Sequence, residues 1–503
     1  MAIKESPIRH VVVVMLENRS FDNMLGRLYD KDNVPRGQAF EGVFNATGAW
    51  WDGAMFPPSN YPGNTSVPSF DPHEPYMHMY LQMIDPRSQS GIVDGIVPNP
   101  VKQAFTMTGF IEDYSTVKEV KGDRDFILEI MNCFRPADVP VINQIAASAA
   151  VCDHWHASVP SQTFTNRSFV HAGTASGYVN NSTWKDGVDH VFMNDTETIF
   201  HRLESAGRKH RIYFGARKHL CNAYVCQKRL RQVGNFFDMG TFFSDVASVG
   251  TTTDEKDFPA YTFIEPILIP GKWGVQNDMH PVKYSMDHIS TVDAGDYLLW
   301  RIHDALSNNH ELWDSTMLIV LFDENGGTYD HVAPVAGGAI SPDAVVLPKG
   351  HAGYSAFEFD RLGMRVPAIV CSPHIEAGTV CNTLFDHTSV IRTVADLFLG
   401  GSPGDEKLGA RAAKANSLLP LIGSTRRTDT PAIKRPKELP RFDFGAFAAA
   451  NADFALSDLQ RALVLGAIQI AAENNSVAFQ AVRGRRLQTL GDAWAISDIL
   501  DGI

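Results

Sequence analysis

The chain has 503 residues, of which 44% are hydrophobic and 20% charged, the proportions of a globular protein with a large core. Its net charge of -13 at pH 7 argues against nucleic acid as a partner, because a phosphate backbone requires a basic surface. No apolar run reaches the roughly 20 residues that span a membrane, and no signal peptide is apparent. We therefore expect a cytoplasmic location, with signal-independent secretion as the alternative.

The first predicted element is a buried strand over Ile8–Leu16. This run is continuous and rich in valine, which is typical of a strand inside a parallel sheet. An acid and an amide, Glu17 and Asn18, follow it directly. Asn18 or Ser20 is placed to cap a helix that runs toward Gly26.

Phe44–Pro100 is rich in proline, glycine, asparagine and aromatic residues and has little periodicity. We expect long loops here, where binding residues tend to lie. The segment holds a pair of histidines, His73 and His78. Its aromatic side chains could meet a lipid or a choline cation, or pack the loops against one another.

Strand-like and helix-like segments alternate through the middle of the chain, which favours a mainly parallel, doubly wound α/β sheet with helices on both faces. The predicted strands are 149–153, His210–Phe214, Tyr261–Glu265, Met317–Phe322 and Pro367–Ser372. The predicted helices are Val139–Ala150, a helix ending near Gly207, Asp296–Leu306 and Thr388–Leu399.

Two threonines, Thr163 and Thr165, precede a predicted helix. A hydroxyl at a helix N-terminus is favoured as an alkoxide by the helix dipole, and the free N–H groups there can hold phosphate. Either threonine is therefore a candidate nucleophile. The alternative is that it only caps the helix.

Asp323 and Glu324 follow the predicted strand Met317–Phe322 directly, as Glu17 and Asn18 follow the first strand. Ligands of open α/β sheets bind beyond the carboxyl ends of the strands. Carboxylates crowded at such an end repel each other unless a cation neutralises them. If the two strands are neighbours, these side chains predict a metal site; a surface turn is the alternative.

The C-terminal part is predicted to be helical. Residues 411–442 are basic and rich in proline, as in a linker or wrapping arm, and 443–503 contain helical patterns over Leu456–Glu473 and Val477–Leu490. We therefore divide the chain into a main domain (1–410), the arm and a helical segment. The apolar Leu456–Glu473 helix needs a covering surface, and we favour a homo-oligomer over its own domain or a membrane interface.

Six cysteines occur without any Cys-x-x-Cys pair: Cys133, Cys152, Cys221, Cys226, Cys371 and Cys381. In a chain of this length we interpret them as reduced thiols. A bridge between Cys221 and Cys226 is the alternative.

Six short motifs, in order, resemble those of the phosphoesterase family that includes bacterial and plant non-specific phospholipases C and a bacterial acid phosphatase. They lie at Glu17–Asp22 (ENRSFD), Thr163–Arg167 (TFTNR), Asn277–Pro281 (NDMHP), Asp323–Val332 (DENGGTYDHV), Gly363–Pro373 (GMRVP…SP) and Phe385–Ser389 (FDHTS). The resemblance implies an alkaline-phosphatase-like α/β fold and phosphoester hydrolysis through a covalent phospho-enzyme. Where the family has proline, this chain has Thr165.

Carried over by position, the resemblance implies one divalent metal ion. Its ligands would be Glu17, Asn18, Asp323, Glu324 and the nucleophile Thr163. His73, His280 and His331, with Asp278 as an orienting carboxylate, would contact phosphate or protonate the leaving group. Asn166 and Arg167 would bind the phosphate, with support of the carboxylates as the alternative role of Arg167. Oxygen ligands favour calcium or magnesium, with zinc as the alternative.

The leading hypothesis is a metal-dependent phospholipase C that cleaves phosphatidylcholine-like lipids to diacylglycerol and a phosphorylated head group. A phosphomonoesterase of the acid phosphatase type is the enzymatic alternative. A metal-stabilised assembly protein is the non-catalytic alternative. The expected partners are a phospholipid or a phosphorylated small molecule, with contact at a membrane surface rather than across it.

Overall fold

The fold is described from a computed structural model. It describes residues 6–88, 105–185, 188–250, 258–285, 289–335, 343, 347, 351, 357–401, 408–429, 432–474 and 476–501.

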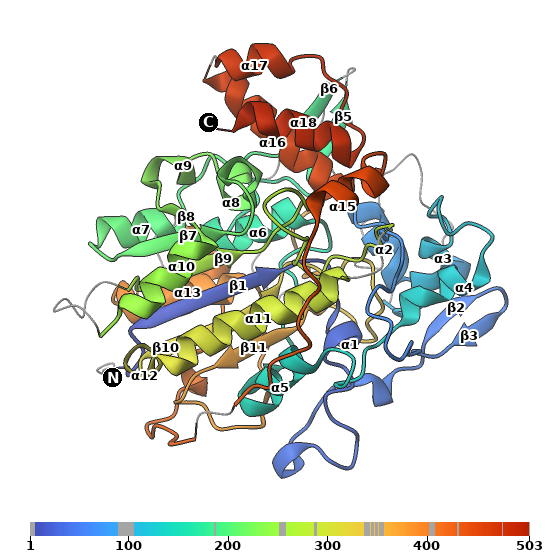
Figure 1. The fold of residues 1–503 in the computed structure, drawn as a ribbon. Helices are drawn as coiled ribbons and strands as arrows, with labels where there is room; N and C mark the ends of the chain where they lie inside the picture. Colours follow the sequence, from blue (N-terminus) through green and yellow to red (C-terminus); the bar gives the residue numbers. More distant parts are fainter. Residues whose placement is uncertain are drawn as a thin grey trace.

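A central eight-stranded sheet organises the molecule (Figure 1). Its strand order is β12-β4-β11-β10-β1-β9-β7-β8. The strands are β1 (His10–Leu16), β4 (Ala150–Cys152), β7 (His210–Phe214), β8 (Phe236–Asp238), β9 (Tyr261–Glu265), β10 (Thr316–Phe322), β11 (Ala368–Cys371) and β12 (Thr379–Cys381). The neighbours β1 and β10 run parallel, and Leu16 lies opposite Phe322. The two predicted strands that end in acids and amides are therefore adjacent.

Helices cover both faces of the sheet, which confirms the α/β prediction. One group is α5 (Pro140–Ser148), α10 (Met239–Ser248), α11 (Thr291–Asn308) and α12 (His310–Trp313), in which α11 contacts the other three and crosses in front of the sheet in Figure 1. The second group is α6 (Thr163–Ala172), α7 (Ile199–Ser205), α8 (Asn222–Cys226) and α13 (Thr388–Phe398), in which α6 contacts the other three.

Two elements differ in detail from the prediction. Strand β11 runs antiparallel to both β10 and β4, because an apolar run carries no information on strand direction. Helix α11 begins five residues before the predicted Asp296, since the Ser290 hydroxyl accepts from the Asp293 N–H at 2.9 Å and caps the helix there.

The prediction of loops over Phe44–Pro100 is only partly right. The segment contains a small hairpin, β2 (Ala49–Trp51) and β3 (Ala54–Phe56), and the helix α2 (Tyr76–Met83). Tyr76, Met79, Tyr80 and Met83 are buried along one side of α2, so the helical spacing was present in the sequence. Residues 89–100 lie outside the described part.

The C-terminal segment forms α15 (Phe444–Asn451), α16 (Asp458–Glu473), α17 (Val477–Val482) and α18 (Leu490–Leu500). A single helix over Val477–Leu490 is wrong, because the chain turns at Gly484 with a φ of +75° and Thr489 caps a new helix. Among the described helices, none has both the length and the apolar character to cross a bilayer.

Helix α16 buries its apolar side chains within the chain, against α8 and α18. This removes the reason for expecting a homo-oligomer, and the oligomeric state stays a prediction. Upstream of these helices, Arg427 of the arm donates to the backbone oxygens of Ser148 at 2.7 Å and Ile375 at 2.9 Å. The division into three domains also stays a prediction, because α16 shares one hydrophobic core with α2.

Candidate active site at the ends of β1 and β10

The backbone joins the two strand ends directly. The Asp323 N–H donates to the Leu16 oxygen at 3.2 Å, and the Asn18 N–H donates to Asp323 Oδ1 at 3.1 Å. Gly326 follows with a φ of +58°, and a Cβ there would lie 2.1 Å from the Asn18 oxygen. Only glycine allows the loop after β10 to turn back against the end of β1.

Three side-chain oxygens at this edge are buried and have no hydrogen-bond partner among the described residues: Asn18 Oδ1, Asp323 Oδ2 and Glu324 Oε1. Burial raises the pKa of Glu324 well above its usual range, with the nearby carboxylates adding to the effect. Such oxygens are costly to bury without a cation. This donor set fits the predicted divalent metal ion, and it contains only oxygen.

Thr163 lies at the same edge of the sheet. It is the first residue of α6, and its hydroxyl donates to Glu17 Oε2 at 3.0 Å. The cap position belongs to Gln162, so Thr163 is not the cap residue. The Thr165 hydroxyl instead faces the Tyr178 oxygen at 3.4 Å. Of the two threonines, Thr163 therefore contacts the carboxylates.

Arg167 and Asn166 have partners other than those predicted. Arg167 Nε donates to Glu17 Oε1 at 2.9 Å and lies 3.5 Å from Asp323 Oδ2. The Asn166 side chain accepts from the Val159 N–H and donates to backbone oxygens of the same loop. Arg167 thus holds the carboxylates in position, which is the alternative role expected for it, and Asn166 holds the loop that precedes Thr163. Binding of phosphate by either residue stays a prediction.

His280 and Asp278 lie on the other side of Glu17. The Glu17 N–H donates to the Asp278 backbone oxygen at 2.8 Å, and Asp278 Oδ1 accepts from the His280 N–H at 2.9 Å. Asp278 therefore orients the backbone of His280 rather than its ring. Burial raises the pKa of Asp278 to about 6, although the charge of His280 acts in the opposite direction.

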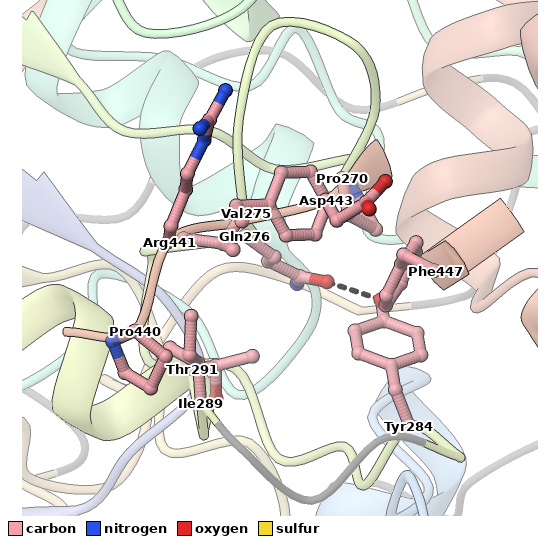
Figure 2. A pocket seen from close by; sticks show the side chains of 11 residues that line it. Pro270, Val275, Gln276, Tyr284, Ile289, Thr291, Pro440, Arg441, Asp443 and Phe447 are labelled. Atoms are coloured by element: carbon pink, nitrogen blue, oxygen red, sulfur yellow. Dashed lines mark hydrogen bonds between the residues drawn. The ribbon is translucent and has the colours of Figure 1, made fainter. Parts of the chain in front are cut away.

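Gln276 lines a small pocket together with residues of the C-terminal segment (Figure 2). The Tyr284 hydroxyl donates to Gln276 Oε1, as the dashed line in Figure 2 shows. Gln276 Nε2 donates in turn to Asp278 Oδ2 at 2.8 Å. Gln460 of α16 also donates to Gln276, at 3.3 Å. The C-terminal segment therefore helps to hold Asp278 in place through Gln276.

Two carboxylates of the site were missed in the sequence. Glu74 accepts from the Asn18 side-chain amide, and His280 Nε2 lies 3.3 Å from Glu74 Oε1 and 3.5 Å from Asp71 Oδ1. Burial raises the pKa of both acids well above their usual range. Both acids lie within two residues of His73, in a short stretch that contains Pro72 and Pro75. Only the histidines of this stretch were predicted to belong to the site.

The other two predicted histidines are placed differently. His73 stacks on His78 with ring centroids 4.0 Å apart, and burial lowers its pKa. Its ring makes no polar contact with the metal-site carboxylates in the described part of the chain.

His331 belongs to a separate buried cluster. Its Nδ1 lies 2.6 Å from Asp22 and its Nε2 lies 3.2 Å from Glu41. Arg365 bridges Asp22 and Asp330 in the same cluster, at 3.0 and 2.9 Å. The described contacts of His331 therefore do not include the proposed metal ligands, and its assignment to phosphate or to the leaving group stays a prediction.

A cavity of about 330 Å³ opens beside His280. It is lined by the aromatic rings of Phe70 and Phe454, the acids Asp71 and Glu119, and further residues of the C-terminal segment. Among these described lining residues there is no lysine or arginine. The charge of Asp458 also acts on Asp71 and Glu74, so the cavity is acidic as well as aromatic.

Comparison with known proteins places this site in a family. The model of the Phosphoesterase family matches residues 8–399. Non-specific phospholipase C3 of Arabidopsis thaliana is 30% identical over 93% of this chain and 83% of its own length. Non-hemolytic phospholipase C of Pseudomonas aeruginosa is 26% identical over 78% of this chain and 54% of its own length.

Among solved structures, murine ectonucleotide pyrophosphatase/phosphodiesterase 5 matches with a TM-score of 0.34 and 12% identity, over 57% of this chain and 95% of its own. A protein in the alkaline phosphatase superfamily from Vibrio parahaemolyticus also matches with a TM-score of 0.34 and 12% identity, over 67% and 81%. The family match, by contrast, spans β1 through α13 and includes every predicted site residue. The chain therefore belongs to the Phosphoesterase family and is a hydrolase of phosphoric esters.

Proposed function

We propose that this hydrolase is a metal-dependent phospholipase C that cleaves phosphatidylcholine-like phosphodiesters. The observation that carries the proposal is the pairing of Thr163 with Glu17 beside three unpartnered buried oxygens. An acidic and aromatic cavity lies beside His280. The Arabidopsis and Pseudomonas relatives, which are named phospholipases C, support the same substrate class.

Thr163 is the proposed nucleophile. Its oxygen attacks the phosphorus atom, and its proton passes to Glu17 along the existing hydrogen bond of 3.0 Å. Burial raises the pKa of Glu17 well above the usual value, while Arg167 opposes this shift. Arg167 meanwhile keeps the carboxylate aimed at Thr163.

His280 is the proposed proton donor for the leaving alcohol. Its Nε2 lies beside the carboxyl groups of Glu74 and Asp71. When the bond from phosphorus to the lipid oxygen breaks, this proton completes diacylglycerol. The phosphorylated Thr163 then still carries the head group, and attack by water releases the phosphorylated head group and restores the threonine.

A divalent ion held by Glu17, Asn18, Asp323, Glu324 and Thr163 would draw charge from the phosphate oxygens and lower the pKa of the threonine hydroxyl. Calcium or magnesium suits the all-oxygen donor set better than zinc. The acidic and aromatic cavity suits a quaternary ammonium head group, because a cation is attracted both to carboxylates and to ring faces.

Rates on two chromogenic substrates test the proposal. We expect p-nitrophenyl phosphorylcholine to be hydrolysed with a higher kcat/KM than p-nitrophenyl phosphate, and phosphatidylcholine vesicles to yield diacylglycerol. Turnover of the monoester alone would replace the phospholipase by a phosphomonoesterase. A chelator should abolish both activities, and calcium or magnesium should restore them.

A further inference from the structure

Two of the six cysteines face each other across neighbouring strands. Cys152 ends β4 and Cys381 ends β12, and the two residues are direct partners in the parallel register. Paired Cα atoms of adjacent strands are about 4.8 Å apart, which lies within the span that a disulfide bridges. All six cysteines are free in this structure, including Cys221 and Cys226, which lie at opposite ends of α8.

The neighbouring thiol also changes the acidity of Cys381. Cys152 lowers the pKa of Cys381 to about 6. Burial opposes the shift, whereas the hydroxyl and N–H of Thr383 add to it. This shift favours the thiolate, which is the reactive form of the side chain. The neighbouring Cys381 and burial raise the pKa of Cys152 well above its usual value.

Of the two sulfur atoms, that of Cys381 is the more accessible to a dissolved reagent. Strand β12 is the edge of the sheet, and Cys381 is 9% exposed while Cys152 is fully buried. The next two residues, Asn382 and Thr383, are exposed. The other four cysteines are buried, and burial raises the pKa of each thiol: Cys133, Cys221, Cys226 and Cys371.

We propose that Cys152 and Cys381 form a reversible disulfide and are a site of oxidative modification by small-molecule disulfides. The Cys381 thiolate attacks one sulfur of oxidised glutathione, and one glutathione thiolate leaves. Cys152 then loses its proton and attacks Cys381 in the mixed disulfide, which releases the second glutathione. The two cysteines lose two electrons and two protons, and the glutathione disulfide gains both.

This bond would join two segments that lead into the active site. Beyond β4 the chain reaches the loop before Thr163, and beyond β12 it reaches His387, whose ring contacts the Asp323 backbone oxygen at 2.6 Å. The backbones of Trp155 and Phe385 already form an isolated parallel β-bridge between these segments. The disulfide would therefore lie at the base of both.

Thiol counting on the folded enzyme tests the proposal. Six free thiols are expected before treatment, and four after incubation with oxidised glutathione and unfolding in the presence of an alkylating agent. Peptide mapping should find Cys152 linked to Cys381, and a reductant should restore six thiols. In Cys152→Ser, the second step is blocked, so a stable glutathione adduct on Cys381 is expected.

Cys371→Ser is the matched control, because it removes a buried thiol from the neighbouring strand β11. It should begin with five thiols and still lose two. Circular dichroism checks that each variant is folded. Six unchanged thiols in the oxidised wild-type enzyme would overturn the proposal. A stable glutathione adduct on Cys381 together with a free Cys152 would also overturn the proposal. Both outcomes are measured on the wild-type chain.

Discussion

Glu17 has two contacts that define its role at the scale of a single residue. One oxygen accepts from the Thr163 hydroxyl and the other from Arg167. The side chain of Arg167 is fully buried and therefore has no contact with solvent. The guanidinium of Arg167 thus fixes the orientation of the Glu17 carboxylate. The threonine whose hydroxyl contacts this carboxylate is Thr163 rather than Thr165.

Replacing Thr163 by alanine should therefore reduce kcat/KM at least about 10³-fold. The fold and the content of bound metal should remain close to those of the wild type, because the other four proposed ligands are kept. Thr165→Ala is the control, since its hydroxyl faces a backbone oxygen, and it should retain most of the activity. Loss of activity in Thr165→Ala with a fully active Thr163→Ala would reverse the assignment.

Glu74 illustrates a residue that the sequence could not identify. Its partner Asn18 is 56 positions away, and only the folded chain brings them together. Because Glu74 accepts from the Asn18 amide nitrogen, the Asn18 oxygen is left without a hydrogen-bond partner among the described residues and is available to a cation. Glu74 is thus a positioning residue for a proposed metal ligand.

We expect Glu74→Leu to weaken metal binding by roughly 10- to 100-fold, as measured by titration calorimetry on the metal-free enzyme. Glu74→Gln keeps an oxygen that can accept from Asn18, so its loss should be smaller. Equal metal affinity in wild type and Glu74→Leu would show that Asn18 does not depend on this contact.

At the scale of elements, the sequence predicted strands well where an apolar run is buried on both faces. Strands β1, β9 and β10 are of this kind, and an acidic residue ends β9 and directly follows β1 and β10. The direction of β11 and the end of α17 could not be predicted in this way. The first depends on pairing with distant strands, and the second on a left-handed turn at Gly484 inside a helical pattern.

The cluster around His331 ties the loop after β10 to α1 (Phe21–Met24). Burial alone would lower the pKa of His331, but its hydrogen bond to Asp22 and the charges of Asp22 and Asp330 raise it. A raised folded pKa means that protonated His331 stabilises the fold fully below its unfolded pKa of about 6.5. This contribution is lost as the pH rises through the raised value.

The free energy of unfolding should therefore fall in His331→Gln by about 1–3 kcal/mol at pH 5.5, and by less at pH 9. Urea unfolding of both proteins at the two pH values measures the difference. A loss that is equal at both pH values would mean that the proton on His331 does not contribute.

At the scale of the whole molecule, the C-terminal helices complete both the core and the site. Phe454 and Leu456 line the cavity beside His280, and Gln460 supports Gln276. The sequence indicated helices here but not their partner surface, because contacts between residues hundreds of positions apart leave no periodic pattern. The surface that we had sought in another subunit is provided by α8 and α18.

Gly466 of α16 lies against Val225 of α8. A Cβ at this position would be 2.3 Å from Val225 Cγ1, so Gly466→Leu should lower the free energy of unfolding by about 1–3 kcal/mol. Gln469→Ala on the exposed side of α16 should change it by less than about 0.5 kcal/mol. Equal stability of the two variants would mean that α16 is not closely packed on α8.

The central claim is covalent catalysis by Thr163 on a phosphodiester. Mass spectrometry of acid-quenched enzyme after brief mixing with phosphatidylcholine tests it most directly. We predict that the peptide containing Thr163 carries a phosphocholine group, because the head group stays on phosphorus while diacylglycerol leaves. Steady turnover with Thr163 unmodified, or with the adduct on another residue, would contradict the account.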